Sequence, residues 1–312
     1  MKLAFVFPGQ GSQSVGMMKA YGDAAVLRAT FDEASLATGI DYWAMVENGP
    51  AEALAQTINT QPLMLAADVA VYRLWRERGG AEPSIVAGHS LGEYAALIVA
   101  GVLRFADAVP LVRLRAEAMQ EAVPAGVGAM AALLGLDEDA ALAACSEASG
   151  AEVVSCANLN APGQIVIAGH SAAVQRAIEI AKLKGAKRAV PLPVSAPFHC
   201  ALMKPAADRL KVQLDTLDIR VPLIPIIHNV DVASHSHPDD IRRALVTQAY
   251  SPVRWIESIK SMARQGCTHI AECGPGKVLG PLSKRIEPSL VGVSLADTVS
   301  MDEALHVLSL KS

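Results

Sequence analysis

The chain has 312 residues, of which 52% are hydrophobic, enough for one large domain with or without a smaller one. Its formal net charge of -4, with acidic and basic residues interspersed, excludes the clustered basic face that nucleic acid would require. The five cysteines are odd in number and never spaced as CxxC, which argues against a disulfide framework and a zinc site, so we expect no metal.

The N-terminal MKLAFVFPGQG is too short in apolar residues for a signal peptide, and no later apolar run reaches membrane-spanning length. We therefore expect a cytoplasmic protein without a membrane partner, and a monomer by default.

Strand and helix alternate in the first part of the chain. A buried strand is followed by the turn PGQGSQ and by helical periodicity, and a second short strand is followed by two helices. This alternation predicts an α/β fold with a parallel sheet. The expected strands are 3–7 and 84–87, and the expected helices are 61–78, 91–100 and 105–123.

The pattern changes from residue 125 to residue 194, where strands and helices follow the order βαββαβ of a ferredoxin-like unit. The two middle strands are joined by NLNAPG, which we interpret as a turn-forming loop. The expected elements are strand 128–136, helix 137–149, strands 151–157 and 164–168, helix 171–184 and strand 186–191.

After residue 194 the first pattern resumes, with strands expected at 223–227, 269–271 and 291–293. We therefore predict a discontinuous core domain, residues 1–124 and 195–312, with residues 125–194 as an inserted subdomain. The cleft between the two parts is the expected ligand site.

The stretch GHSLG, residues 88–92, matches G-x-S-x-G between a predicted strand and a predicted helix. In that context the motif is typical of a nucleophile elbow, whose serine oxygen is exposed at a helix N-terminus beside amide donors. Ser90 is the candidate nucleophile. The alternative is a Gly-Ser turn that caps the helix.

A nucleophilic serine needs a base within hydrogen-bond reach. His89 is adjacent, but neighbouring side chains on an extended segment point to opposite sides, so we expect His89 to be structural. His199 closes PVSAPFHC, where the chain returns to the core at the mouth of the cleft; a half-buried histidine that caps the next helix fits nearly as well. Cys200 is expected to be a buried, inert thiol.

Arg115 lies on the apolar stripe of the predicted helix 105–123, among Leu111, Val112, Ala118 and Met119. A guanidinium on a core-facing stripe needs an anionic partner. That partner is either a protein carboxylate or the carboxylate of a ligand held in bidentate fashion.

Six motifs occur in order along the chain: PGQGSQ, GHSLGEYAAL, LVRLRAEAMQEAVP, NLNAPGQIVIAG, PVSAPFH and ECGPGKVL. In this order and spacing the sequence resembles the malonyl-CoA:acyl carrier protein transacylases of bacterial fatty acid synthesis over essentially its whole length. The resemblance implies an α/β-hydrolase-like core with a ferredoxin-like insert. It also implies malonyl-CoA and a phosphopantetheinyl acyl carrier protein as substrates, ping-pong transfer and no cofactor.

The resemblance further implies a role for each matching residue. Ser90 would be the acylated nucleophile and His199 its base, without the carboxylate of a full triad. Substrate-binding roles would fall to Arg115 (malonyl carboxylate), the amides of Gln10 and Leu91 (oxyanion), the main-chain carbonyl of Gln248 (His199 orientation), Asn160 (cleft wall) and Phe198 (malonyl over methylmalonyl).

Several alternatives remain open at this point. The carrier can belong to a polyketide synthase rather than to fatty acid synthesis. A serine esterase or thioesterase on the same scaffold would need an acid between Ser90 and His199 and an HGGG-type loop, and no HGGG is present. A catalytically silent acyl-binding module would not need Ser90, His199 and Arg115 together. Lys182, Lys184, Lys187 and Arg188 are candidates for carrier docking, with a solvated helix face as the simpler interpretation.

Overall fold

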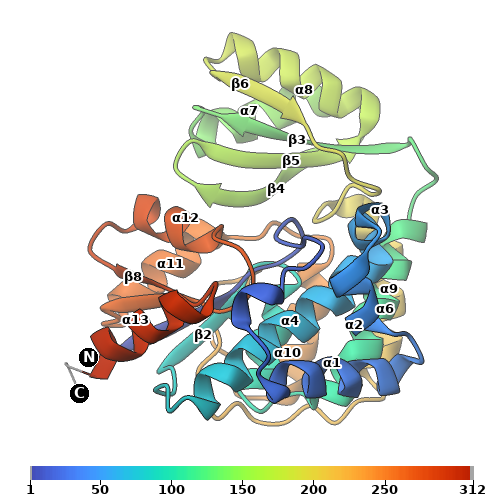
Figure 1. Cartoon of the computed structure of the whole chain (residues 1–312). Helices are drawn as coiled ribbons and strands as arrows, with labels where there is room; N and C mark the ends of the chain where they lie inside the picture. Colours follow the sequence, from blue (N-terminus) through green and yellow to red (C-terminus); the bar gives the residue numbers. More distant parts are fainter. Residues whose placement is uncertain (1, 310–312) are drawn as a thin grey trace.

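The computed structural model describes residues 2–309 and contains two β-sheets, one in each of two lobes (Figure 1). The larger lobe holds a parallel sheet in the order β2-β1-β7-β8. Its strands are β1 (Leu3–Phe7), β2 (Ile85–Gly88), β7 (His269–Glu272) and β8 (Val291–Ser294). Strands β1, β2 and β7 are buried throughout, as expected for a parallel sheet that is covered on both faces.

Side chains of β1 alternate between two hydrophobic cores. Phe5 and Phe7 point into a core with one group of helices, whereas Ala4 and Val6 point into a core with the other group. The first group contains α1 (Ala25–Thr38), α2 (Tyr42–Asn48), α3 (Ala51–Ala55), α4 (Thr57–Glu77), α5 (Gly92–Val99), α6 (Phe105–Glu121), α9 (Lys204–Leu214), α10 (Pro238–Gln248) and α13 (Thr298–Ser309). The second contains α11 (Trp255–Arg264) and α12 (Leu279–Ile286).

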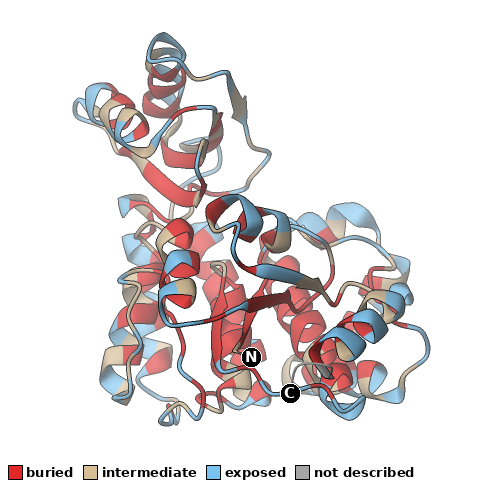
Figure 2. Cartoon of the chain, turned by 90° about the vertical axis from the view of Figure 1, so that its left-hand side faces the viewer, coloured by how far each residue is buried: buried red, intermediate tan, exposed pale blue. Residues whose placement is uncertain are grey.

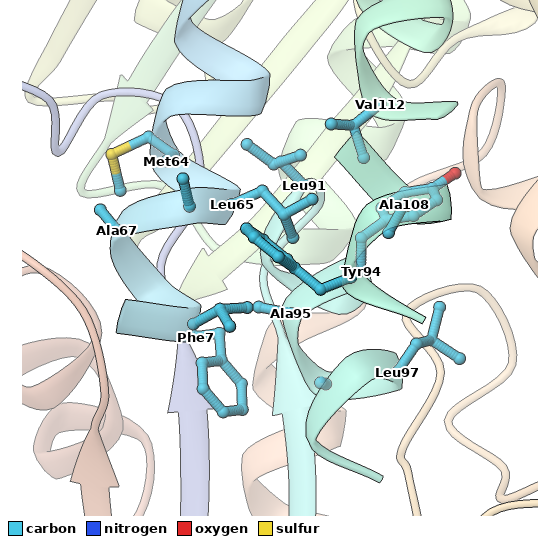
Figure 3. Close-up of a cluster of buried hydrophobic side chains, with 14 of the residues drawn as sticks. Phe7, Met64, Leu65, Ala67, Leu91, Tyr94, Ala95, Leu97, Ala108 and Val112 are labelled. Carbon is cyan, nitrogen blue, oxygen red and sulfur yellow. The ribbon is translucent and has the colours of Figure 1, made fainter. Parts of the chain in front are cut away.

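Helix α5 follows β2 directly and is enclosed by its neighbours. Figure 3 shows Tyr94 and Leu91 of α5 and its N-terminus among Leu65 of α4, Val112 of α6 and Phe7 of β1. Every residue from Gly92 to Leu97 is buried. This packing gives the N-terminus of α5 a fixed position at the carboxyl end of the parallel sheet.

The smaller lobe is an antiparallel sheet in the order β4-β5-β3-β6 with two helices against it (Figure 1). Its elements are β3 (Gly128–Leu134), α7 (Glu138–Ser149), β4 (Val154–Ala161), β5 (Gln164–His170), α8 (Ser171–Leu183) and β6 (Arg188–Pro191). The chain order is βαββαβ, so the predicted α/β fold class with a ferredoxin-like insert is confirmed. The exact division at residues 125 and 194 stays a prediction.

The lobes share interior as well as backbone contacts. One hydrophobic core contains Val6 and Ile85 of the parallel sheet together with Leu133 and Ile165 of the antiparallel sheet. Val253, just before α11, exchanges backbone hydrogen bonds of 2.9 and 3.0 Å with β4. In Figure 2 the strands at the centre of the larger lobe are buried, while the surrounding helices carry exposed residues on their outer sides.

Two sequence expectations about elements are wrong. Residues 223–227 form no strand; Ile226 makes a single bridge to Val86. Pro222 and Pro225 lack the amide proton that a sheet ladder requires, so the segment passes β2 without joining the sheet. The stretch NLNAPG is mostly strand, because β4 continues to Ala161 and leaves only residues 162–163 for the turn.

The other predicted elements are present with boundaries shifted by a few residues. The sequence expectations gave no range for helices α1 to α3 or α9 to α13, and α4 begins four residues before the predicted start.

Candidate active site

The segment between β2 and α5 is a tight elbow whose backbone is strained at Ser90. Ser90 has φ of 52°, in the left-handed region that non-glycine residues rarely adopt. A Cβ atom at Gly92 would lie 2.1 Å from the Phe7 carbonyl oxygen, and one at Gly88 would lie 1.8 Å from the Gly92 carbonyl carbon. Both glycines of GHSLG are therefore sterically required, which favours the nucleophile elbow over an ordinary capping turn.

His199 is the side chain that the fold brings to Ser90. Its Nε2 lies 2.6 Å from Ser90 Oγ, and its Nδ1 lies 2.9 Å from the main-chain carbonyl oxygen of Gln248. Because a carbonyl oxygen can only accept, Nδ1 carries the proton and the Nε2 lone pair faces the serine hydroxyl. No carboxylate among residues 2–309 bonds to the His199 ring, so the pair is a dyad.

The environment of His199 keeps its imidazole neutral. The ring is buried, and this burial, assisted by the positive charge of Arg115, lowers the pKa of His199 to about 3. A neutral imidazole is the form that can accept the Ser90 proton.

Arg115 is a buried cation that hydrogen-bonds to no protein carboxylate in the described chain. It is 2% exposed, and its guanidinium donates to Gln61 Oε1 at 2.7 Å and to Gln248 Oε1 at 2.9 Å. It also lies 3.3 Å from Ser90 Oγ and over the ring of Tyr94, while its Nε has no hydrogen-bond partner. Of the two partners considered from sequence, the ligand carboxylate fits this geometry and the protein carboxylate does not.

The loop PGQGSQ passes beside the elbow. A Cβ atom at Gly9 would lie 2.6 Å from the carbonyl oxygen of His89 and 3.7 Å from the amide nitrogen of Leu91. Within the described residues, the amides of Gln10 and Leu91 donate no hydrogen bond to another protein group. Two unengaged N–H donors beside Ser90 are what an oxyanion site needs.

These groups open into one cavity of about 140 Å³ between the lobes. Residues of both lobes and of the segment that joins them contribute to its wall, which is typical of ligand sites. The lining residues are Gln10, Gln61, His89, Ser90, Leu91, Arg115, Met119, Met130, Asn158, Leu192, Val194, Phe198 and His199.

Asn160 and His89 differ in position from the sequence expectations. The asparagine on the cavity wall is Asn158, whereas the side-chain oxygen of Asn160 accepts a hydrogen bond of 2.7 Å from His89 Nε2. The His89 ring also packs edge-on against Trp255. His89 therefore has partners other than Ser90, as expected of a structural residue, and it also lines the cavity.

Cys200, next to His199, is an inert thiol. Its Sγ donates to the Pro197 carbonyl oxygen at 3.1 Å, and burial raises the pKa of the thiol to about 11. At neutral pH it is protonated and therefore a weak nucleophile.

The basic cluster suggested for carrier docking lies at the end of the small sheet that is away from the cavity. Lys182 and Lys184 form ion pairs with Glu179 and Glu147. Arg188 pairs in register with Leu134, at the end of β3 opposite to the cavity residue Met130. The solvated surface interpretation fits these residues better.

Sequence reasoning missed four buried polar residues around the elbow: Gln61, Glu93, His228 and Asn229. Only Glu93 left a signal, as a carboxylate within the otherwise apolar α5. Gln61, His228 and Asn229 come from segments whose local sequence does not predict that they lie near Ser90.

No helix within residues 2–309 combines the length and apolar character needed to cross a membrane. The same residues include no cluster of three or more His, Cys, Asp or Glu side chains placed to hold a metal ion.

Comparison with known proteins agrees with this geometry. The model of the acyl transferase domain family matches residues 4–280. The chain belongs to the acyl transferase family. It is 53% identical over 307 residues to the malonyl CoA-acyl carrier protein transacylase of Escherichia coli K12, covering 98% of this chain and 99% of that one. The Bacillus subtilis protein of the same name is 46% identical over 309 residues, covering 98% and 97%.

Solved structures of acyl transferases match over the whole fold. The acyl-carrier-protein S-malonyltransferase of Burkholderia pseudomallei superposes with a TM-score of 0.97 at 59% identity, covering 98% of this chain and 100% of that chain. A malonyl-transacylase solved in complex with a type II polyketide synthase acyl-carrier protein also gives 0.97, at 50% identity, covering 98% and 100%.

Proposed function

We propose that this acyl transferase moves the malonyl group of malonyl-CoA to the phosphopantetheine thiol of acyl carrier protein, through a malonyl ester on Ser90, and so supplies fatty acid chain elongation. The observation that carries the proposal is Arg115, a buried guanidinium that lies 3.3 Å from Ser90 Oγ and hydrogen-bonds to no carboxylate within residues 2–309. A bound acyl group that ends in a carboxylate supplies the missing anion.

In the first half-reaction Ser90 Oγ attacks the thioester carbonyl carbon while His199 Nε2 accepts the hydroxyl proton. The amides of Gln10 and Leu91 donate to the oxyanion of the tetrahedral intermediate. The C–S bond then breaks, and the proton on His199 passes to the departing thiolate of coenzyme A.

In the second half-reaction the carrier's phosphopantetheine thiol gives its proton to His199 and attacks the malonyl-Ser90 carbonyl carbon. The same two amides hold the second oxyanion, and collapse returns the proton to Ser90 Oγ. Only His199 moves protons in either half, so no cofactor or metal is required by this route.

Acyl selectivity follows from the cost of an unpaired buried charge. A malonyl carboxylate pairs with Arg115, whereas an acetyl or longer aliphatic group leaves the guanidinium without an anion. Phe198 lies on the cavity wall, where its ring would leave less space for the extra methyl group of a methylmalonyl chain.

The hydrolase alternative is less consistent with this site. The group that orients His199 is a main-chain carbonyl, not the acid of a Ser-His-Asp triad. A silent binding module has no chemical need for the 2.6 Å contact between Ser90 Oγ and His199 Nε2 or for a strained serine backbone.

The test is the mass of the intact protein after incubation with malonyl-CoA alone. We expect a stable adduct of one malonyl group, absent in Ser90→Ala, that disappears when holo acyl carrier protein is added. Rapid release of free malonate without an adduct would instead identify a hydrolase. No adduct and no malonate would identify a binding module.

The carrier is tested in the second half-reaction by offering the malonyl-enzyme a fatty acid carrier and a polyketide carrier separately. The type II polyketide complex of a 50% identical relative makes this comparison informative. We expect faster discharge to the fatty acid carrier. We also propose that the protein acts as a cytoplasmic monomer.

A further inference from the structure

Glu93 is a fully buried carboxylate in the first turn of α5, three residues after the nucleophile. Among residues 2–309 it forms no ion pair with lysine or arginine. Instead, three donors converge on it: His228 Nδ1 at 2.7 Å, the Asn229 amide at 3.1 Å and Gln248 Nε2 at 3.0 Å. A buried carboxylate is costly unless its oxygens are satisfied, so these donors and Glu93 hold one another in place.

One branch of this network holds the elbow. The main-chain N–H of Asn229 donates to Glu93. Its side chain accepts a hydrogen bond from the Ser90 N–H through Oδ1 at 2.8 Å and donates through Nδ2 to the Gly88 carbonyl oxygen at 2.7 Å. Asn229 therefore binds the backbone on both sides of His89, at Gly88 and at the strained Ser90.

The second branch holds Gln248. The Gln248 Nε2 group donates to Glu93 and, at 2.9 Å, to the Ser90 carbonyl oxygen, which leaves Oε1 facing Arg115. A flipped amide would place an oxygen against the carboxylate and an NH₂ group against the guanidinium. Glu93 thus fixes which end of the Gln248 amide meets Arg115.

We propose that Glu93 is a positioning residue that sets malonyl selectivity through Gln248 without touching substrate. This inference rests on the proposed function, because selectivity has meaning only if Arg115 binds the malonyl carboxylate. The wild-type adduct experiment tests the function, whereas the Glu93 variants test only the positioning, so the two can fail separately.

Two variants of similar size separate position from charge. Glu93→Asp keeps a carboxylate, but its side chain is one methylene shorter, so the carboxylate lies farther from Asn229 and Gln248. Glu93→Gln keeps the reach and loses the charge. Its Oε1 can still accept from Asn229 and Gln248, while its NH₂ donates to His228 Nδ1, provided that the His228 proton moves to Nε2, which has no partner in the described structure.

The readout is the ratio of kcat/KM for Ser90 loading by malonyl-CoA to that by acetyl-CoA. We expect Glu93→Asp to lower the ratio at least about tenfold and Glu93→Gln to stay within about threefold of wild type, since one bond of Arg115 is misaligned only in the former. A low ratio in Glu93→Gln with a normal ratio in Glu93→Asp would overturn the proposal. So would equal ratios in both variants and wild type, or an equal loss in both.

Glu257→Asp is the matched control, because Glu257 also lies in the first turn of a helix but pairs with Arg254 at the surface. Its ratio should equal that of wild type. Circular dichroism establishes that each variant is folded. If Glu93→Asp does not fold, Glu93→Gln keeps the proposal falsifiable, because a tenfold loss of the ratio in that variant overturns positioning.

Discussion

Arg115 separates recognition from chemistry at the scale of single residues. Ser90 and His199 can acylate with any thioester, whereas the guanidinium recognises only an acyl group that carries its own negative charge. Arg115→Ala should therefore lower malonyl loading about 10- to 100-fold, the value of a charge-assisted hydrogen bond of 1.5–3 kcal/mol, while acetyl loading holds or rises. Rapid-quench measurement of kcat/KM with both thioesters tests this, with Arg113→Ala on the same helix as the control. An equal loss with both thioesters would remove the carboxylate role.

The pH dependence of loading follows from the His199 pKa of about 3. The base works only when it is unprotonated, so kcat/KM for acetyl-CoA should be flat between pH 8 and about pH 5 and fall as the pH falls through this pKa. With a histidine of ordinary pKa near 6.5 as base, kcat/KM would already fall between pH 7 and pH 6. Because the positive charge of Arg115 disfavours the imidazolium, Arg115→Ala should move the acidic limb to higher pH. A wild-type profile that halves near pH 6.5 would contradict this assignment.

At the scale of elements, helix α4 carries an unfavourable buried group. Asp68 is fully buried, and neither of its side-chain oxygens has a hydrogen-bond partner in the part of the chain that the structure describes. Burial, followed by the nearby Glu272, raises the pKa of Asp68 well above the ordinary value. The unfolded chain releases this proton above about pH 4 while the folded chain keeps it. The contribution of Asp68 to stability is therefore most favourable below that pH and falls by about 1.4 kcal/mol per pH unit above it until the folded pKa is passed.

Asp68→Asn removes this titration while keeping the shape of the side chain. We expect the variant to have a higher Tm than wild type, with a larger gain at pH 8 than at pH 5. Differential scanning calorimetry at the two pH values measures both quantities. A lower Tm at both would show that the carboxyl group stabilises α4 and its surroundings.

Much of the element structure and part of the site follow from local sequence. The alternation along residues 85–100 predicts β2, the elbow and α5, because strand periodicity, two glycines and helical periodicity occur there in sequence. The segment around Pro225 shows the limit: its apolar residues look like a strand, but the prolines prevent a ladder. Asn229 shows another limit, since its contact with Ser90 spans 139 residues and no local pattern encodes it.

At the scale of the whole molecule, the two lobes share one hydrophobic core. Because Leu133 and Ile165 of the small sheet pack in the same cluster as Val6 and Ile85 of the large sheet, neither sheet has an independent interior on that side. We expect a single cooperative unfolding transition in denaturant, with tryptophan fluorescence of the larger lobe coinciding with amide exchange in β5. An earlier transition confined to the smaller lobe would contradict this expectation.

Three of the residues that hold Ser90 come late in the chain. His199, Asn229 and Gln248 contact it directly, and the last of these follows the nucleophile by 158 residues. A nascent chain on the ribosome therefore carries the serine long before it carries the means to activate it. Because the Gln248 carbonyl orients His199, we expect acylation to begin only after Gln248 has left the exit tunnel.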